Sequence, residues 1–444
     1  MKQSRLARPA PSRFRRHWAL APGIAFLNHG SFGACAKPIL TLQTDLRRQM
    51  EAEPIQFLWR RYEERLEPAR AEVARFVGAR RADLVFVTNA TTGVNAVVGS
   101  LKLRPGQEIV ATNHDYNACR NVLIEAARRA GARLVVAQLP FPLASADEVV
   151  EAVLSAVNRR TRLVLLDHVT STTALVLPVA RLIRELEARG IDTLVDGAHG
   201  PGMVSLNLSA LAPAYYTANL HKWVCAPKGA GFLWVRQDKQ KEVQPAVISH
   251  GNNTPRPGYS AFQDRFDWAG TFDPSAWLCA GEAIRWMGKL LPGGWEEVRQ
   301  HNHQLAIQAR KILCDRLEVE APCPGTMLGS MATIALPGWF QGLPRSGRID
   351  AEQERLYDQF GIEVPLMRFG QPERRYLRIS AHIYNSPAEY AYLAEALSLL
   401  SGALDLRSKG TAWAAAPKGV SCLQRRRVQG PWSTKAPLWP PSRK

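Results

Sequence analysis

Two short stretches, residues 195–200 and 219–223, carry side chains suited to amine and carboxylate chemistry. In the first, an apolar run ends in Asp196 and His199 follows; in the second, a short run is followed by Lys222. A carboxylate directly after a buried run is costly unless it pairs with a cation. A buried lysine has a lowered pKa, which frees its amine as a nucleophile. The pattern predicts that Lys222 attacks a carbonyl group near Asp196; a structural salt bridge and a surface lysine are the alternatives.

The elements around these stretches alternate between short apolar runs and helical periodicity. The predicted strands are residues 84–88, 108–112, 133–138, 162–167, 191–196, 215–219 and 231–235. The predicted helices between them include residues 92–101, 117–130, 146–157 and 179–189. This alternation predicts an α/β fold, a mostly parallel seven-stranded sheet with helices on both faces. Ligands of such sheets bind outside the carboxyl ends of the strands, where Asp196, His199 and Lys222 fall.

Polar residues also follow the first two predicted strands. Ala90, Thr91 and Thr92 stand at the start of a predicted helix, where backbone N–H groups and hydroxyls suit a phosphate. The alternative is simple helix capping. His114 and Tyr116 follow the second strand and reach the same edge of the sheet, so both are candidates for contact with a ligand.

Seven stretches occur in an order that resembles the class V aminotransferase family of fold type I pyridoxal phosphate (PLP) enzymes. Within that family the resemblance is strongest to the isopenicillin N epimerase branch. The stretches are residues 28–33, 88–95, 167–171, 195–200, 219–223, 270–271 and 376–380. Each is weak by itself, but together they span about residues 20–400 and form a specific pattern.

The resemblance implies pyridoxal 5'-phosphate as cofactor, held as a Lys222 aldimine with Asp196 at the ring nitrogen and His199 at the ring oxygen. Lys228 is a rival for the reactive amine. The other cofactor-binding residues that it implies are Ala90, Thr91, Thr92, His114, Ser171, Asn219, His221 and Thr271. Either His114 or Tyr116 would stack on the open face of the ring.

The resemblance also implies an amino-acid or amino-acid-derived substrate, contacted by Asn28, His29 and Arg378. Arg378 would bind the substrate α-carboxylate through its two-pronged guanidinium group; the alternative is a structural salt bridge. Thr271 would reach the phosphate across a subunit interface, which predicts a homodimer.

The expected reaction is epimerisation or racemisation at the α-carbon, as in isopenicillin N epimerase. It needs acid/base groups on both faces of the substrate, and we predict Lys222 for one and Tyr116 or His114 for the other. A C–S lyase or an aminotransferase acting on a sulfur-containing amino acid is the alternative, and a PLP-fold regulator is a third. Residues 363–372, where related desulfurases carry a nucleophilic cysteine, hold none, which argues against persulfide chemistry.

The net charge of +18 over 444 residues is concentrated at the two ends. Residues 1–16 hold six basic residues and no acid, and residues 403–444 hold nine basic residues and one acid, so the rest carries only +4. This distribution argues against a nucleic-acid-binding face in the fold. Seven scattered cysteines without a C-x-x-C pair predict neither a metal site nor a disulfide framework and suit the cytoplasm. The sequence has no run of eighteen apolar residues, so we expect no membrane span.

Four segments are predicted along the chain. They are a basic arm at 1–16, a large PLP-binding domain at 17–274, a smaller α+β domain at 275–402, and a basic, disordered tail at 403–444. In the smaller domain we expect helices at 275–291, 295–317, 350–360 and 387–400, with strands at 331–336 and 376–383.

Overall fold

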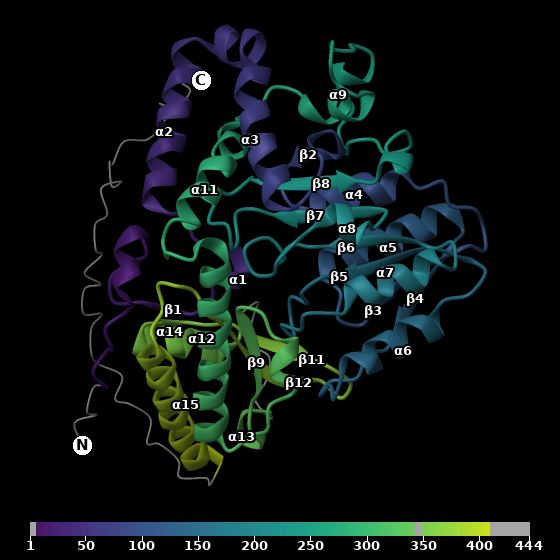
Figure 1. Ribbon diagram of the computed structural model, residues 1–444. Helices are drawn as coiled ribbons and strands as arrows, with labels where there is room; N and C mark the ends of the chain where they lie inside the picture. Colours follow the sequence, from purple (N-terminus) through teal and green to yellow (C-terminus); the bar gives the residue numbers. More distant parts are fainter. Residues whose placement is uncertain (1–5, 342–348, 409–444) are drawn as a thin grey trace, which may run out of the picture. The chain divides into compact units, whose positions relative to one another are not determined.

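The computed structural model describes residues 6–341 and 349–408 of the chain (Figure 1). The described residues up to 401 form one compact unit, and residues 402–408 belong to a second. The predicted division at residue 274 therefore lies inside the first unit and remains a prediction. Of the predicted tail, residues 403–408 belong to the last helix, α15 (Pro387–Ser408), and residues 409–444 lie outside the described chain.

A seven-stranded sheet organises the first unit, in the order β2-β8-β7-β6-β5-β3-β4. Its strands are β2 (Leu84–Val87), β3 (Glu108–Thr112), β4 (Arg133–Ala137), β5 (Thr161–Asp167), β6 (Asp192–Asp196), β7 (Tyr215–Asn219) and β8 (Gly231–Val235). The pairs from β4 to β7 are parallel, and β8 runs antiparallel to β7 and β2. The α/β fold class and the seven strands are confirmed, with ends that differ by about one residue from those predicted.

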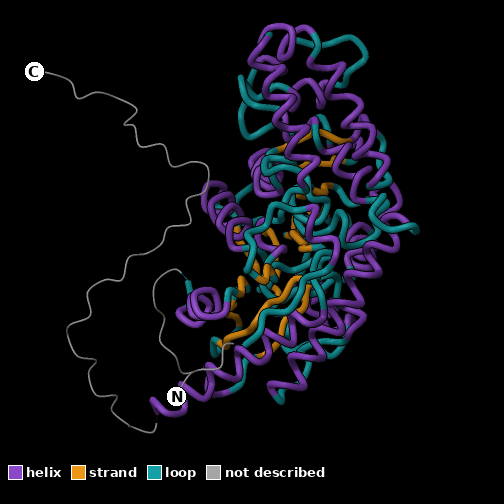
Figure 2. Tube along the Cα trace, turned by 90° about the vertical axis from the view of Figure 1, so that its left-hand side faces the viewer, coloured by secondary structure: helices purple, strands orange, loops and turns teal. Residues whose placement is uncertain are grey.

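Helices cover this sheet because each has one apolar side. In α7 (Val179–Glu187), the buried residues Val179, Leu182, Ile183 and Leu186 recur at the spacing of one helix face. The other helices beside the sheet are α4 (Ala90–Ser100), α5 (Asn117–Ala130) and α6 (Ala146–Ala156). Figure 2 shows strands lying between helices, as expected of a sheet that is buried on both faces.

A second, antiparallel sheet lies further along the chain, in the order β11-β12-β9. It consists of β9 (Met331–Ala335), β11 (Leu366–Phe369) and β12 (Arg374–Ser380). We did not predict β11, nor the short parallel pair of β1 (Ala25–Phe26) with β10 (Ile362–Glu363). Two- to four-residue strands carry too little periodicity to be read from sequence.

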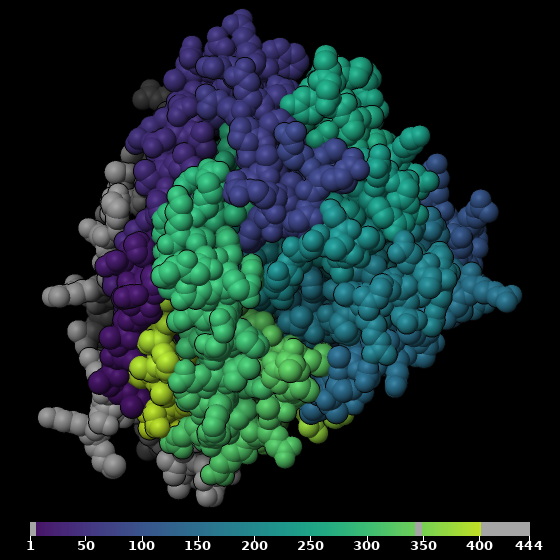
Figure 3. Space-filling model, viewed as in Figure 1, coloured from purple at the N-terminus to yellow at the C-terminus, as the bar shows by residue number. Residues whose placement is uncertain are grey.

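The later part of the chain contains two long helices, α12 (Gly294–Leu317) and α15, and α12 packs against β9 and β12 of the second sheet. The shorter helices there are α11 (Ala280–Met287) and α14 (Ala351–Phe360), and α14 contacts β10. The predicted helix at 275–291 is divided into α10 (Ser275–Leu278) and α11. On the face drawn in Figure 3, α11 (green) packs beside α3 (Tyr62–Phe76, blue-violet). Among the described residues, no helix is both long and apolar enough to cross a bilayer.

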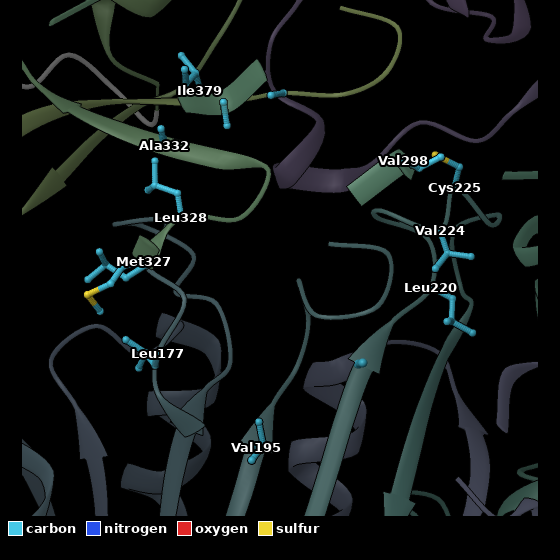
Figure 4. Packing of buried hydrophobic residues seen from close by; sticks show 14 of the residues in the cluster. Leu177, Val195, Leu220, Val224, Cys225, Val298, Met327, Leu328, Ala332 and Ile379 are labelled. Atoms are coloured by element: carbon cyan, nitrogen blue, oxygen red, sulfur yellow. The ribbon is translucent and has the colours of Figure 1, made fainter. Parts of the chain in front are cut away.

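One hydrophobic cluster joins the two sheets. Figure 4 shows members of the cluster in both regions, Val195 on β6 and Leu220 and Val224 after β7, and Ala332 and Ile379 of the second sheet. All five residues are buried completely. The loop after β7, which carries Lys222, is therefore anchored by apolar contacts on both sides, and its position is fixed by the core rather than by solvent-exposed loops.

Candidate active site

A cleft of about 340 Å³ opens at the carboxyl ends of the parallel strands. The residues that line it are Ser31, Phe32, Thr88, Asn89, Ala90, Thr91, Tyr116, Asp167, Ser171, Asp196, Ala198, His199, Asn219, His221, Lys222, Lys228 and Gly229. These positions span nearly two hundred residues of sequence. They meet because consecutive parallel strands all end at the same edge of the sheet.

The Lys222 amine is held as a hydrogen-bond acceptor in this cleft. Trp223 Nε1–H donates to His199 Nδ1 at 3.3 Å, so the remaining imidazole proton lies on Nε2. That nitrogen is 3.1 Å from Lys222 Nζ and donates to it, which requires a neutral amine. Burial and the nearby Arg378 charge lower the pKa of Lys222 to about 7. The arrangement thus keeps a nucleophilic amine available near neutral pH.

Asp196 lies at the end of β6 with 2% of its surface exposed. Its Oδ1 accepts the Ala198 N–H at 2.9 Å, and its Oδ2 accepts the Cys119 S–H at 3.2 Å. Burial raises the pKa of Asp196, while these hydrogen bonds and the Lys222 charge oppose the rise. Both oxygens act as acceptors, so this carboxylate is arranged to receive one more N–H from a ligand.

The start of α4 forms another wall of the cleft. Asn89 caps the helix by accepting the Thr92 N–H at 2.9 Å, and Asn219 Oδ1 accepts the Ala90 N–H at 2.8 Å. Thr92 is thus engaged in capping and does not line the cleft, whereas Ala90 and Thr91 do. His221 lines the same region, with Nδ1 3.2 Å from the Ala230 carbonyl. The positive end of a helix beside this group of polar residues suits an anion.

Arg378, on β12, is buried and is not itself a lining residue; it contacts Ser31 and Ser171, which line the cleft. Its Nη1 donates to the Ser171 carbonyl at 2.5 Å and its Nη2 to Ser31 Oγ at 2.7 Å. Asn28 Oδ1 lies 3.4 Å from the same Nη2. No carboxylate of the described residues comes within 4 Å of this guanidinium group, and its Nε has no hydrogen-bond partner among them. A buried cation without a counter-ion is costly, and an anionic ligand would relieve that cost.

The two rings that follow β3 lie in different surroundings. Tyr116 lines the cleft with 46% of its surface exposed. His114 is buried behind it, with Nδ1 2.6 Å from Thr173 Oγ1 and its ring 4.4 Å from that of Phe369. Burial lowers the pKa of His114 to about 4, so this imidazole is neutral. Of the two candidates, Tyr116 has direct access to a molecule in the cleft.

Two other predicted site residues lie away from the cleft lining. His29 is buried completely, with Nε2 3.0 Å from the Lys222 carbonyl and Nδ1 2.7 Å from the Tyr384 hydroxyl. These contacts make it a support for the Lys222 backbone rather than a wall of the cleft. Thr271 is exposed and lines no part of the cleft of its own chain.

Sequence reasoning missed two residues beside Asp196. Asp167 ends β5 and lines the cleft, and Cys119 on α5 donates to the Asp196 carboxylate. Asp167 has the signal that identified Asp196, a carboxylate directly after an apolar run. Cys119 has no such signal, because its role depends on which face of α5 meets the sheet.

The chemistry of these donors fits PLP. Lys222 is the neutral amine that an aldehyde requires, Asp196 is an acceptor for a protonated ring nitrogen, and Thr91 with the start of α4 suits a phosphate. Lys228 is less suited to the aldehyde because its Nζ donates to the Gly33 carbonyl at 2.9 Å.

Comparisons with known proteins identify the family to which the chain belongs. Isopenicillin N epimerase from Streptomyces clavuligerus is 35% identical over 401 residues, which cover 87% of this chain and 98% of that protein. A probable chloroplastic L-cysteine desulfhydrase from Arabidopsis thaliana is 29% identical over 412 residues, 87% of this chain and 84% of that protein.

Among solved structures, a C-DES mutant with glycine covalently linked to its PLP cofactor superposes with a TM-score of 0.72. It is 21% identical, and the match covers 86% of this chain and 98% of the other. The family model for aminotransferase class-V matches residues 54–341. The chain therefore belongs to the aminotransferase class-V family of PLP-dependent enzymes and has their fold type I architecture.

Proposed function

We propose that this enzyme epimerises or racemises an amino-acid substrate at its α-carbon, in the manner of isopenicillin N epimerase. The observation that carries the proposal is that Lys222 and Tyr116 line one cleft next to Arg378, a buried cation without a carboxylate partner. Inversion needs a proton acceptor and a proton donor near the same carbon atom, and this pair supplies both. The 35% identity to an isopenicillin N epimerase over most of both chains supports the same reaction.

Each residue has a distinct task in this proposal. PLP, when bound, withdraws electrons from the α-carbon and so makes its proton acidic. Lys222 takes or returns that proton on one side, and Tyr116 does so on the other. Arg378 binds the substrate carboxylate through the guanidinium edge that Ser31 and Ser171 hold in place. His199 keeps the Lys222 amine neutral and oriented.

A C–S lyase acting on a sulfur-containing amino acid is the second candidate. The specific observation in its favour is the similarity to L-cysteine desulfhydrases, at 29–30% identity over 87–88% of this chain. A lyase needs a base at the α-carbon and an acid for the departing sulfur, and Lys222 with Tyr116 could serve these roles too. The products, not the site residues, separate the two reactions.

The enzyme is further proposed to act as a homodimer. Thr271 is exposed and does not line the cleft of its own chain, as expected of a residue that serves the partner's site. Phe32 lines the cleft mouth with 75% of its surface exposed, which also suits coverage by a second subunit.

The test incubates the PLP-loaded enzyme with single amino acids in D2O and follows both α-deuterium uptake and product identity. Epimerisation gives deuterium uptake together with inversion of configuration at the α-carbon. Sulfide release indicates a lyase, and a 2-keto acid without sulfide indicates an aminotransferase.

The Tyr116→Phe variant separates the two acid/base roles. We expect the rate of racemisation to fall ~100-fold or more. Deuterium uptake with retention of configuration at the α-carbon should persist, because Lys222 still exchanges the proton on its own side. His114→Asn is the matched control on the neighbouring ring. Unchanged racemisation in both variants would exclude Tyr116 and His114 as the second acid/base group.

A further inference from the structure

Two carboxyl groups end adjacent strands beneath the cleft. Asp167 on β5 is paired in register with Asp196 on β6, and neighbouring strands lie about 4.8 Å apart. Both side chains are almost fully buried, at 3% and 2% exposure, and both line the cleft. Two ionised carboxylates at such neighbouring, in-register positions repel each other strongly in a site with little water, so one of them tends to keep its proton.

Hydrogen bonds show which of the two is arranged to be ionised. Asp196 accepts one bond on each oxygen, from Ala198 N–H and from the Cys119 thiol. By contrast, Asp167 Oδ2 is buried and has no partner among the described residues. An ionised oxygen left in that position would lose its hydration without compensation, whereas a protonated one carries a hydrogen that it can donate.

The charged and titratable groups around the pair favour the same assignment. Asp115, in the loop before α5, adds a third carboxylate, which is paired with Arg120 on α5. Lys222, after β7, lies close enough to both carboxyl groups that each raises the pKa of its amine, although burial and Arg378 lower that pKa more. Tyr216 on β7 is buried and its pKa lies well above its usual value because of burial, so it contributes no charge. Burial, Asp196 and Asp115 all raise the pKa of Asp167.

We propose that Asp167 is held as a neutral carboxylic acid that donates its proton to Asp196, so that the pair presents a single negative charge to the ring nitrogen of PLP. Asp167 is thereby a positioning residue: it fixes the Asp196 carboxylate and prevents a second buried charge. The inference rests on the proposed placement of the cofactor between Lys222 and Asp196, but not on which reaction follows.

The first test is the infrared spectrum of the full-length protein, without and with PLP, at pH 7. We expect a carbonyl band of a protonated carboxyl group in the wild type that is lost in Asp167→Asn, an isosteric change that keeps a hydrogen-bond donor. The wild-type spectrum does not depend on the folding of a variant, and the absence of any protonated carboxyl band in it would overturn the proposal.

The second test is PLP affinity, measured by the visible absorbance of the bound cofactor. Asp167→Asn should bind PLP within a few-fold of the wild type, because the neutral donor is retained. Asp196→Asn should bind it at least ~10-fold more weakly, because the charge partner of the ring nitrogen is lost. The PLP affinity of Asp167→Ala should lie between the affinities of these two asparagine variants. Circular dichroism verifies the fold of each variant.

The failures of the two proposals are distinguishable. If the wild type binds PLP but Asp167→Asn weakens binding as much as Asp196→Asn, then Asp167 is ionised and this inference is wrong while the cofactor placement stands. If Asp196→Asn and Lys222→Met leave PLP binding unaltered, the placement itself fails.

Discussion

At the scale of single residues, the positions of the protons on His199, Lys222 and Arg378 determine what these groups can bind. The Trp223–His199 hydrogen bond fixes the imidazole tautomer, and in that tautomer His199 Nε2–H donates to Lys222, which can accept only when its amine is uncharged. Arg378 is held by neutral oxygens and so keeps its charge available for a substrate. These contacts explain why the reactive amine and the anion-binding group can coexist in one buried cleft.

The lowered pKa of Lys222 has a measurable effect on stability. The pKa is about 7 in the folded chain and 10.5 in the unfolded one. Between these values the unfolded chain holds more protons, so the unfolding free energy of the PLP-free protein rises with pH. Lys222→Met should remove this rise and should be the more stable protein below pH 7, by up to about 5 kcal/mol. Denaturant unfolding at pH 6 and at pH 9 measures this difference in unfolding free energy between the two proteins. Parallel pH profiles for the wild type and Lys222→Met would contradict the prediction.

Arg378→Lys tests the carboxylate-binding role. A lysine keeps the charge but loses the two-pronged geometry, so we expect KM for the amino-acid substrate to rise ~10- to 100-fold with a smaller change in kcat. Arg374→Lys, at the exposed start of the same strand, is the matched control and should leave both constants unchanged. Equal KM values in the two variants would show that Arg378 binds no substrate carboxylate.

At the scale of elements, the loop before α2 (Lys37–Ala52) supports the reactive lysine. Gly33 has φ +70, and a Cβ atom there would lie 2.0 Å from the His221 carbonyl oxygen and 2.8 Å from Lys222 Cα. His29, in the short helix α1 (His29–Phe32), bonds to the Lys222 carbonyl. The N-terminal segment therefore packs directly against the backbone that carries the amine.

Gly33→Ala should displace the Lys222 backbone. We expect a loss of stability of about 2–4 kcal/mol, from the left-handed backbone and the steric clash together, and weaker PLP binding. Gly106→Ala isolates the first cause, since Gly106 has φ +80 but open space around its Cβ position. It should cost only about 1 kcal/mol and leave PLP affinity unchanged. Thermal unfolding measures the stability of the two variants, and PLP titration measures their cofactor affinity. Similar losses of stability in Gly33→Ala and Gly106→Ala would refute the close-packing argument.

At the scale of the whole molecule, the question is whether one chain completes the active site. The cleft contains the amine, the carboxylates and the start of α4, but it lacks Thr271. A two-fold dimer in which each subunit lends Thr271 to the other would complete the phosphate contacts.

Mixed dimers test this arrangement. Lys222→Met and Thr271→Ala each impair activity when alone. If Thr271 acts on the partner's site, a mixed dimer contains one site with both changes and one intact site, so activity should exceed the sum of the two parent proteins. If Thr271 acts within its own chain, no intact site forms and activity should not rise. Sedimentation velocity confirms the dimer before mixing.

Much of this architecture is accessible from sequence. The strands of the large sheet other than the edge strand β4 are strongly patterned because they are buried on both faces, and the carboxyl ends of the strands identify Asp196, His199 and Lys222. The small sheet is less accessible: β11 and the β1–β10 pair depend on partners far along the chain. The placements of His29 and Asp167 were also not predicted.

The order of strands and polar residues along the chain thus determined the fold class and the edge of the sheet where chemistry occurs, because those follow from local periodicity and strand polarity. The cofactor followed from the resemblance of seven ordered stretches to a known family. Tertiary structure alone decided which side chains share the cleft: Tyr116 rather than His114, Asp167 beside Asp196, and His29 behind the lysine. The physical reason is that side-chain direction and hydrogen-bond partners depend on register and packing between distant segments, which no local pattern records.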